Sequence, residues 1–579
     1  MDIRQPRLVR VLPLAGALAL IAFLLLPGSA EAQHQPTINQ SKAIEIARDD
    51  PKAIEALREH PDLSPSATRN ENTADWEVGF YADGDQLVQV VVDDVGGDIL
   101  ESWSGQQVAW RMARGYPGAF GRAVNSPWVW LTLCFIFVVG LFDWRRPLRL
   151  AHLDLLVIVA GFGVSHYFFN EGEIGLSVPL AYPPLVYLLG RALWMGFRRD
   201  RGSWLRPSAP IAVLAGITVL LVGARIALNV MDSNVIDVGY SGVIGADRIA
   251  DGTTLYGNFP EDNQTGDTYG PVAYYAYLPF EQALDWSGTW DDLPAAHAAA
   301  IFFDLGTMVG LFMLARRLRP GRDGNALGVL LCFAWAACPY TAFALESNTN
   351  DALVSMTLVA ALLALDSAPA RGIALALSSL SKFAPLALGP LFATYGATSP
   401  GPRPVRRYAR AVLPFAAAFA VTAVVVSIQA LIDPGLDTYW HRTIGEQGGR
   451  DSPFSVWGQD HSLGWLQAVG KVAVIALALL AAFLPRVRDH LTVAALGAAL
   501  LIGMQLTIDH WFYLYIPWFL PFLFLALLGG ALVTLPGRDH DRVDPASEPV
   551  VSDLDDGAHH PDVLVRRIET DRHLGAEGL

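Results

Sequence analysis

Long apolar segments constrain this chain more than any other feature of its sequence. Hydrophobic residues make up 52% of its 579 residues and charged residues 17%, whereas a soluble chain usually has about 25% charged residues. Several apolar segments reach roughly 18 residues with few charges, which is long enough to cross the hydrocarbon core of a bilayer. One such segment is also typical of a buried core helix, but so many together are not. The sequence therefore predicts an all-α polytopic membrane protein with about eleven spans, at 127–142, 151–169, 178–197, 209–231, 296–316, 324–343, 351–366, 409–432, 462–484, 490–508 and 512–534.

The charges between these segments predict which side of the membrane each loop faces. Lys and Arg collect in the cytoplasmic loops of membrane proteins, and the acidic loops that alternate with the basic ones are therefore placed outside. The two largest external loops are 232–294 and 433–461. The charged segment 536–579 shows little periodicity, which predicts a disordered cytoplasmic tail. The basic loops are 144–149, 198–206, 316–322, 403–410 and 486–488.

Segment 372–395 has to enter and leave on the cytoplasmic side for this alternation to hold. Lys382, Pro385 and Pro390 lie in its middle. Proline removes a backbone donor and clashes with the preceding helical turn, so we expect two half-helices in a re-entrant hairpin. Interrupted helices at membrane depth are tolerated where they are buried in protein or line a cavity. A plain span with a basic flank is the alternative.

The polar N-terminal part is predicted to be a small extracytoplasmic domain. Residues 1–32 combine three arginines, an apolar run and an Ala-Glu-Ala triplet, which predicts a signal peptide or an N-terminal anchor. Residues 33–125 follow as an α+β domain. Its helix is expected at 41–60 and its strands at 76–81, 87–92 and 99–103. The segments WEVGFY and LVQVVVDDVGGDIL in this order resemble a PepSY-type domain, which implies a regulatory or interaction module with a protein partner.

Charge and cysteine content exclude some classes of function. The net charge of −15 does not suggest a nucleic-acid partner, since those proteins present basic surfaces. Cys134, Cys332 and Cys338 all lie in apolar segments, so no disulfide framework is expected. The chain is therefore expected in the cell membrane, with its N-terminal domain and large loops outside.

The loop after the fourth predicted span carries most of the residues that suggest chemistry. It begins with Asp237 and Tyr240, continues to Tyr256, and ends in an aromatic segment that opens with Tyr269. A loop of this length is usually functional or disordered, and its density of aromatic, Gly and Pro residues argues against disorder. Tyrosines that only collect at the bilayer interface are the alternative.

Two segments of this loop, DVGYSGVIGADRIADGTTLYG and TYGPVAYYAYLPF, resemble the first large external loop of GT-C glycosyltransferases. The closest likeness is to glycosyltransferase family 87, whose mannosyltransferase-like members use polyprenyl-phosphate sugars. The likeness covers 209–534 and implies a GT-C-like domain over 126–535. This chain departs from the family in having Tyr269-Gly270-Pro271 for Tyr-Pro-Pro, and in its PepSY-like module. Further matching segments are ESNTNDAL, SKFAPLALGP, SPFSVWGQ and DHWFYLYIPWFLPF.

The resemblance implies that a sugar passes, with inversion, from a polyprenyl-phosphate donor to an envelope glycan, lipid or protein acceptor. Such a transfer needs a base for the acceptor hydroxyl. Asp237 lies just beyond a span, where a lipid head group would sit, and is the candidate; a solvated loop Asp is the alternative. The leaving phosphate needs a cation. Lys382 is the candidate because ionisable groups at membrane depth are costly, and snorkelling to the interface is its alternative.

Other substrate-binding candidates are polar or aromatic residues near the predicted outer face. Arg225 and Asp304 lie at similar depth in the spans beside the large loop, where a structural ion pair is the simpler interpretation. Arg442 or Arg450 could hold phosphate or sugar, because a guanidinium suits both. Lys471 is a second, weaker candidate for phosphate. The complete set of substrate-binding candidates is Tyr240, Tyr256, Tyr269, Lys382, Arg225, Asp304, Asn350, Asp351, Arg442, Arg450, Gln459, His510 and Tyr513.

No cofactor is expected beyond the lipid-linked sugar donor. Asp291-Asp292 and Asp93-Asp94 are adjacent acids without converging ligands, so a divalent metal stays an unsupported alternative. Two other functions stay open. A transporter or flippase of lipid-linked sugars would also use intramembrane charges and broken helices. A non-catalytic membrane sensor would use the PepSY-like domain and leave the large loop without a role.

Overall fold

A computed structural model describes residues 37–70, 74–82, 85–115, 121–198, 205–397, 404–445 and 452–530. The predicted signal segment 1–32, the predicted tail 536–579 and Arg450 lie outside the described residues. The described part is mostly helical, with one small antiparallel sheet near the N-terminus. This agrees with the predicted combination of a helical bundle and an N-terminal α+β region.

The N-terminal region contains two helices and four strands. The predicted single helix over 41–60 is wrong, because Asp50 accepts hydrogen bonds from the amides of Lys52 and Ala53 and Pro51 opens a second helix. An aspartate cap followed by proline is a strong start signal. The first strand was not predicted, and the other three were. The elements are α2 (Gln40–Arg48), α3 (Pro51–Glu59), β1 (Ser64–Arg69), β2 (Trp76–Ala82), β3 (Asp85–Val92) and β4 (Ile99–Ser104).

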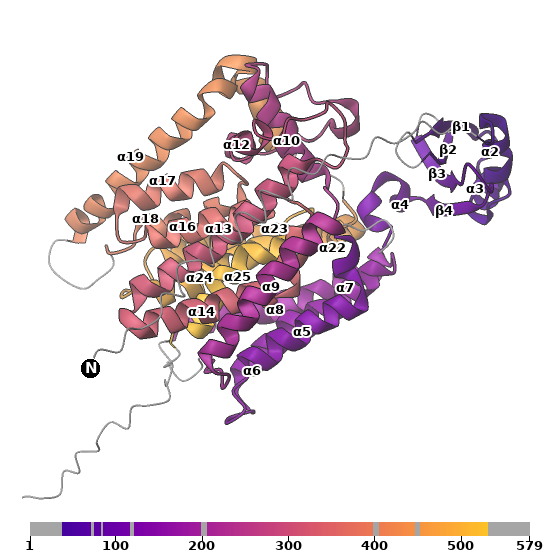
Figure 1. Ribbon diagram of the computed structural model, residues 1–579. Helices are drawn as coiled ribbons and strands as arrows, with labels where there is room; N and C mark the ends of the chain where they lie inside the picture. The colour runs from indigo at the N-terminus through magenta and orange to yellow at the C-terminus, as the bar shows by residue number, and fades with distance from the viewer. Residues whose placement is uncertain are drawn as a thin grey trace, which may run out of the picture. The chain divides into compact units, whose positions relative to one another are not determined.

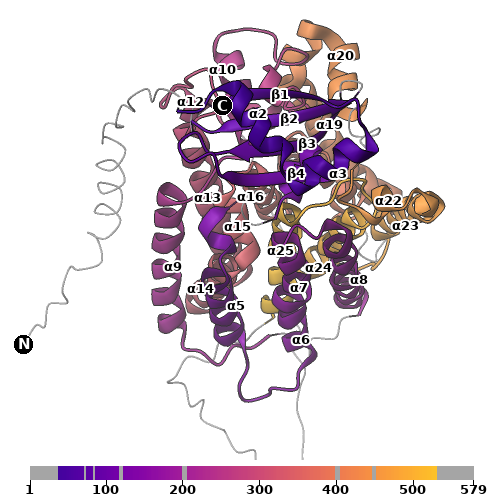
Figure 2. The ribbon, with the colours of Figure 1, turned by 90° about the vertical axis from the view of Figure 1, so that its right-hand side faces the viewer.

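The four strands pair in sequence order, each antiparallel to the next (Figure 2). Successive side chains of a strand point to opposite faces. Val78 and Phe80 of β2 and Val90 of β3 are therefore buried together on one face, against Ala43 and Ala47 of α2. The other face carries the polar residues of the same strands. The hydrophobic core of this region thus lies between the sheet and its two helices.

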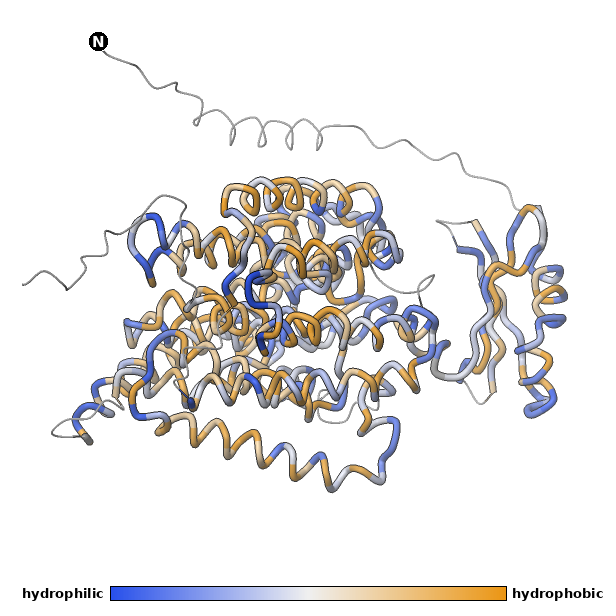
Figure 3. Tube along the Cα trace, turned by 90° about the horizontal axis from the view of Figure 1, so that it is seen from below, coloured by the Kyte–Doolittle hydropathy of each residue, from blue (hydrophilic) through white to orange (hydrophobic). Residues whose placement is uncertain are grey.

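The remaining described helices form the bundle drawn in Figure 1. Its long helices are mostly apolar along their length, and polar residues gather in the connecting segments (Figure 3). The elements of the bundle are α5 (Pro127–Leu141), α6 (Leu150–Leu156), η3 (Val157–Gly161), α7 (Phe162–Asn170), α8 (Ile174–Phe197), α9 (Ile211–Met231), α13 (Pro294–Leu318), α14 (Gly321–Ala337), α15 (Pro339–Glu346), α16 (Asp351–Leu363), α17 (Ala368–Ser379), η6 (Ala384–Leu388), α18 (Gly389–Ala393), α19 (Pro404–Ala430), α23 (Gly464–Ala481), α24 (His490–Gln505), η10 (Tyr513–Tyr515) and α25 (Ile516–Leu528).

Among the described residues, six helices are long and apolar enough to cross a membrane, or seven if the bent pair α14 and α15 counts as one span. The prediction of about eleven spans is therefore not confirmed. The other predicted spans are shorter apolar helices, namely α5, α16, α24 and α25. In α25 every residue is buried by neighbouring helices. A helix covered on all sides by protein has the same apolar sequence as one covered by lipid, so composition alone does not fix the number of spans.

The chain is interrupted at Lys382, where an interruption was predicted. Helix α17 ends at Ser379, and the short helices η6 and α18 begin after Lys382 and pack back against α17. The two large loops also contain short helices. They are α10 (Asp237–Ala250), η5 (Glu261–Asn263), α11 (Pro271–Tyr275) and α12 (Leu278–Glu281) in the first loop, and η7 (Leu431–Gly435), α20 (Leu436–Trp440), η8 (His441–Gly445), α22 (Val456–Gln459) and η9 (His461–Leu463) in the second.

Candidate functional site

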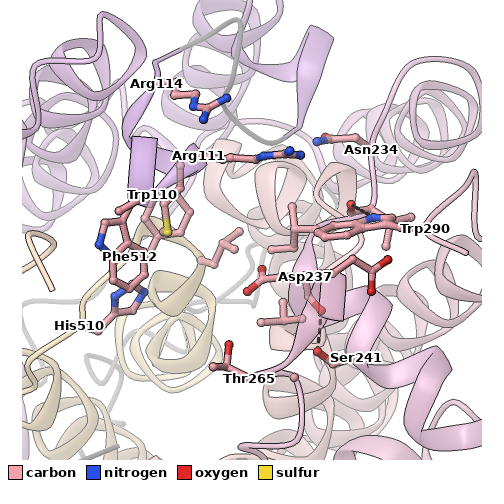
Figure 4. Close-up of a pocket in the computed structure, with 18 of the residues that line it drawn as sticks. Trp110, Arg111, Arg114, Asn234, Asp237, Ser241, Thr265, Trp290, His510 and Phe512 are labelled. Carbon is pink, nitrogen blue, oxygen red and sulfur yellow. Dashed lines mark hydrogen bonds between the residues drawn. The ribbon is translucent and has the colours of Figure 1, made fainter. Parts of the chain in front are cut away.

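A cavity of about 1340 Å³ brings together five of the residues singled out from the sequence. Asp237, Tyr269, Asp351, Lys382 and His510 all line it. They come from four separate segments of the chain, and no two of them are neighbours in sequence. Figure 4 shows Asp237 with Trp290 on one side of this cavity and His510 with Trp110 and Phe512 on the other. This convergence makes the cavity the candidate site.

Asp237 is the first residue of α10, and its side chain is exposed at the cavity. Its backbone is held firmly. The carbonyl oxygen of Asp237 accepts hydrogen bonds from Oγ of Ser241 at 2.6 Å and from Nδ2 of Asn263 at 3.0 Å (Figure 4 shows the first). A carboxylate on a rigid helix start can act on a ligand in the cavity without reorganising the loop.

The start of α10 is also fixed to the segment between α15 and α16. The amide of Ile236 donates to the carbonyl of Ser347 at 3.2 Å. Nδ2 of Asn348 donates to the carbonyl of Asn234 at 3.0 Å, and a β-carbon on Gly239 would lie 2.1 Å from the carbonyl oxygen of Asn348. The segment ESNTNDAL therefore positions the loop that carries Asp237, and it also contains Asp351.

Lys382 and Asp351 form an ion pair with 2.6 Å between Nζ and Oδ1, and both side chains are buried. The same carboxylate accepts hydrogen bonds from Nε1 of Trp518 at 2.9 Å and from Oγ1 of Thr349 at 2.5 Å. The Lys382 ammonium lies 5.1 Å from the ring centroid of Tyr269 and 5.4 Å from those of Tyr515 and Trp518. A cation surrounded by aromatic faces is stabilised by their quadrupoles.

Tyr269 reaches Lys382 because its loop lies directly against the end of α17. The amide of Val272 donates to the carbonyl of Leu380 at 3.1 Å. A β-carbon on Gly270 would lie 2.1 Å from that carbonyl oxygen. Glycine between Tyr269 and Pro271 is therefore what this close approach requires.

Two predicted tyrosines support the loop rather than line the cavity. Tyr240 is fully buried, packs on Trp290 with 4.9 Å between ring centroids, and donates to Asp262 at 3.2 Å. Burial and the adjacent Asp262 raise the pKa of Tyr240, so it stays a neutral donor. Tyr256 is buried as well and donates to the carbonyl of Tyr269 at 2.9 Å.

Arg225 and Asp304 form a buried ion pair, with 2.6 Å between Nη2 and Oδ1. Arg225 also donates to the carbonyls of Trp335 at 3.3 Å and Ala336 at 3.0 Å. These carbonyls lie at the break between α14 and α15, which are bent by 61° relative to each other. Carbonyls at a helix end have no intrahelical partners. The pair therefore stabilises the broken helix, and neither residue lines the cavity.

Arg442 pairs with a residue that sequence reasoning missed. Its Nε donates to Oδ2 of Asp267 at 2.8 Å, its Nη2 donates to Oδ1 at 2.5 Å, and Asp267 is fully buried. Arg442 also donates to the carbonyl of Gln264. This fork joins the second large loop to the first and gives Arg442 a structural partner; its contact with phosphate or sugar stays a prediction.

Four other predicted residues lie away from the cavity. Nε2 of the Gln459 side chain donates to the carbonyls of Ile174 and Pro453. Tyr513 is buried, with its hydroxyl 2.5 Å from Oγ of Ser165. Asn350 is buried beside Asp351 without lining the cavity. Lys471, the second phosphate candidate, pairs at the surface with Asp509 at 3.3 Å.

Several residues of the site were not predicted. Thr349 and Trp518 hold Asp351 in place, and Trp110 stacks on His510 with 5.5 Å between ring centroids. Thr349 and Trp518 lie inside segments that had been singled out, but nothing in their spacing indicates a shared partner. Within the described residues there is no group of three or more His, Cys, Asp or Glu side chains placed to hold a metal ion.

The sequence was compared with models of known protein families and with curated proteins. Neither comparison gives a match. The likeness to GT-C glycosyltransferases therefore rests on the residues quoted for it.

Proposed function

We propose that this chain is an integral membrane glycosyltransferase that transfers a sugar from a polyprenyl-phosphate donor to an acceptor hydroxyl. The observation that carries the proposal is the convergence of Asp237 with Lys382 and Asp351 on one large cavity. A carboxylate and a cation in one cavity are what a transfer of this kind needs, one for the acceptor proton and one for the leaving phosphate.

In the proposed reaction Asp237 takes the proton of the acceptor hydroxyl. The acceptor oxygen then forms a bond to the anomeric carbon of the sugar. The bond from that carbon to the phosphate oxygen breaks, and its electron pair leaves with the polyprenyl phosphate. A single displacement of this kind inverts the anomeric centre.

Lys382 would bind the leaving phosphate. Its ammonium has three donors, and one of them is directed to Oδ1 of Asp351. Asp351 would hold the ammonium in place, assisted by Trp518 and Thr349. A fixed charge costs no reorganisation when the phosphate charge develops.

A transporter of lipid-linked sugars is the second candidate, and the bend between α14 and α15 is the observation that favours it. Transporters commonly bind their ligands at broken helices. The carbonyls at the end of α14 accept hydrogen bonds from Arg225, so the break is occupied by the protein itself. The enzyme is therefore the better-supported proposal.

The test is transfer by the purified chain in proteoliposomes supplied with radiolabelled polyprenyl-phosphate hexoses and pentoses. General-base catalysis typically contributes about 10²- to 10⁴-fold to a rate. We therefore expect transfer to fall by about 10²-fold or more in Asp237→Asn. Asp251→Asn is the matched control, because Asp251 caps the other end of α10 and does not line the cavity.

Transfer that survives Asp237→Asn would remove Asp237 as the base. Absence of transfer with every donor, together with movement of the labelled lipid across the bilayer, would favour the transporter instead.

A further inference from the structure

A row of aromatic rings extends from Lys382 along the cavity. The Lys382 ammonium lies 5.4 Å from the ring centroid of Tyr515, which is 6.4 Å from that of His510. His510 in turn stacks on Trp110, with 5.5 Å between centroids and 29° between ring planes. All four residues line the cavity. The row therefore begins at the proposed phosphate-binding cation and continues away from it.

These rings differ from the aromatic residues that anchor proteins in a bilayer. Trp128 on α5 is of the anchoring kind, because 84% of its surface is exposed on the outside of an apolar helix. Trp110 and His510 are half-buried and share their cavity with carboxylate and amide groups. A large apolar ring beside hydrogen-bonding groups suits a ligand that has both an apolar face and polar edges. A sugar ring, with C–H bonds on its faces and hydroxyls on its rim, is such a ligand.

The charge of the cavity restricts the kind of sugar. Its described lining contains six carboxylates, from Asp75, Glu77, Glu101, Asp237, Asp262 and Asp351, but only three Lys or Arg residues, Arg111, Arg114 and Lys382. One of these cations, Lys382, is already paired with Asp351. Bringing a polyanion against an excess of like charge is costly. The lining therefore favours a neutral glycan over one built from uronic acids or carrying many phosphates.

The size of the cavity indicates how much of that glycan it holds. Its volume of about 1340 Å³ exceeds the range of roughly 300–1,000 Å³ that is typical of pockets for one small molecule. Trp290 lies on the side of Asp237, across the cavity from Trp110 (Figure 4). There is thus room for several sugar units, with the reacting one beside Asp237.

We propose that the acceptor is a neutral oligosaccharide whose successive rings pack against Tyr515, His510 and Trp110. This inference rests on the proposed transferase function and names the acceptor class for the same cavity. The glycan could be free in solution or linked to a lipid, because the row of rings recognises only the sugar.

The test is binding of the full-length chain, in nanodiscs, to an array of neutral homo-oligomers of glucose, mannose, galactose and N-acetylglucosamine, one to six units long. Oligogalacturonides of the same lengths are the charged comparison. We expect binding to strengthen with length among neutral glycans. Truncating an aromatic anchor typically costs a factor of about ten or more in affinity, so Trp110→Ala should show such a loss, while Trp110→Phe keeps a ring and most of the binding. Trp128→Ala is the matched control.

Absence of glycan binding, preference for the oligogalacturonides, or equal binding by wild type and Trp110→Ala would each overturn the inference. Transfer of sugar to a peptide or a monosaccharide without binding to longer glycans would also overturn it, while leaving the transferase proposal intact. Length-dependent glycan binding without any transfer would support glycan binding along the row of aromatic rings and contradict the transferase proposal.

Discussion

The carbonyl oxygen of Leu380 occupies the position that a side chain on Gly270 would need, 2.1 Å from the ideal β-carbon. The first large loop and the Lys382 segment therefore touch where no side chain fits. We expect Gly270→Ala to lower the free energy of unfolding by about 1–3 kcal/mol, as overpacking commonly does. Transfer should fall as well, because Tyr269 and Lys382 would be pushed apart. Thermal unfolding and the transfer assay measure the two effects.

Gly270→Pro should be no better tolerated than Gly270→Ala, since proline also carries a β-carbon. Gly223→Ala in α9 is the control, because a β-carbon there meets no atom within 4 Å. Equal loss of stability in Gly223→Ala and Gly270→Ala would show that the contact with Leu380 is unimportant.

The buried pair of Lys382 and Asp351 predicts an asymmetry between single and double variants. Removing one partner of a buried pair leaves an uncompensated charge and typically costs about 3–5 kcal/mol. We therefore expect Lys382→Met to destabilise the chain strongly. The double variant Lys382→Met with Asp351→Asn should recover much of the stability, but no transfer. Thermal unfolding of the set gives the coupling between the two sites.

Lys471 and Asp509 supply the comparison for this pair. Their side chains are 47% and 36% exposed, and exposed pairs contribute only about 0–1 kcal/mol. Lys471→Met should consequently change stability little. A double variant of Lys382 and Asp351 that retained transfer would remove Lys382 from the proposed reaction.

The candidate site shows what could and could not be predicted from sequence. Lys382 was identified because a charge in an apolar segment is costly, and Asp237 because it follows a span. Their surroundings were not predictable, since Asp351 lies 31 positions from Lys382 and Trp518 lies 167 positions from Asp351. Contacts at such separations depend on helix packing, which leaves no periodic signal in either segment.

The span count of about eleven is not confirmed, for a related physical reason. Helices α24 and α25 are apolar because protein covers them, and composition does not distinguish a protein neighbour from a lipid one. The buried pair of Arg225 and Asp304 was the opposite case. Two opposite charges at equal depth in neighbouring apolar helices have few other ways to be satisfied, and the structure forms that pair.

The fork between Arg442 and Asp267 predicts that the two large loops depend on each other. Arg442→Lys keeps the charge but loses the two parallel hydrogen bonds to a fully buried carboxylate. Lysine is therefore not equivalent here. We expect a lower unfolding temperature and reduced transfer, together with faster hydrogen–deuterium exchange in peptides that cover 261–280.

Arg317→Lys is the matched control for this fork. Arg317 pairs with Asp366, and both side chains are almost half exposed. Replacement there should leave exchange in 261–280 unchanged. If Arg442→Lys and Arg317→Lys behave alike, the fork does not hold the loops together.

Asp94 predicts how the stability of the N-terminal sheet depends on pH. Burial alone would raise the pKa of Asp94, but hydrogen bonds from the Thr37 amide and the Trp76 indole, with Arg69 nearby, lower it below the ordinary 3.8. A carboxyl whose pKa is lower in the folded state stabilises that state above its unfolded pKa. This stabilisation is lost as the pH falls through the folded pKa. The stabilisation from Asp94 should therefore be complete at neutral pH. It should begin to fall near the ordinary pKa of about 3.8 and be lost once the pH is below the pKa of the folded state.

Asp94→Asn isolates this contribution. Exchange in peptides covering β2 should be faster in the variant than in the wild type at neutral pH, because Trp76 of β2 donates to Oδ1 of Asp94 at 3.0 Å. The difference should shrink as both proteins are brought to acid, since protonation removes the same charge from the wild type. Asp98→Asn is a suitable comparison, as Asp98 lies in the turn before β4 and is exposed. A gap between wild type and Asp94→Asn that stayed constant across the acid range would mean that Asp94 acts through its shape, and not through its charge.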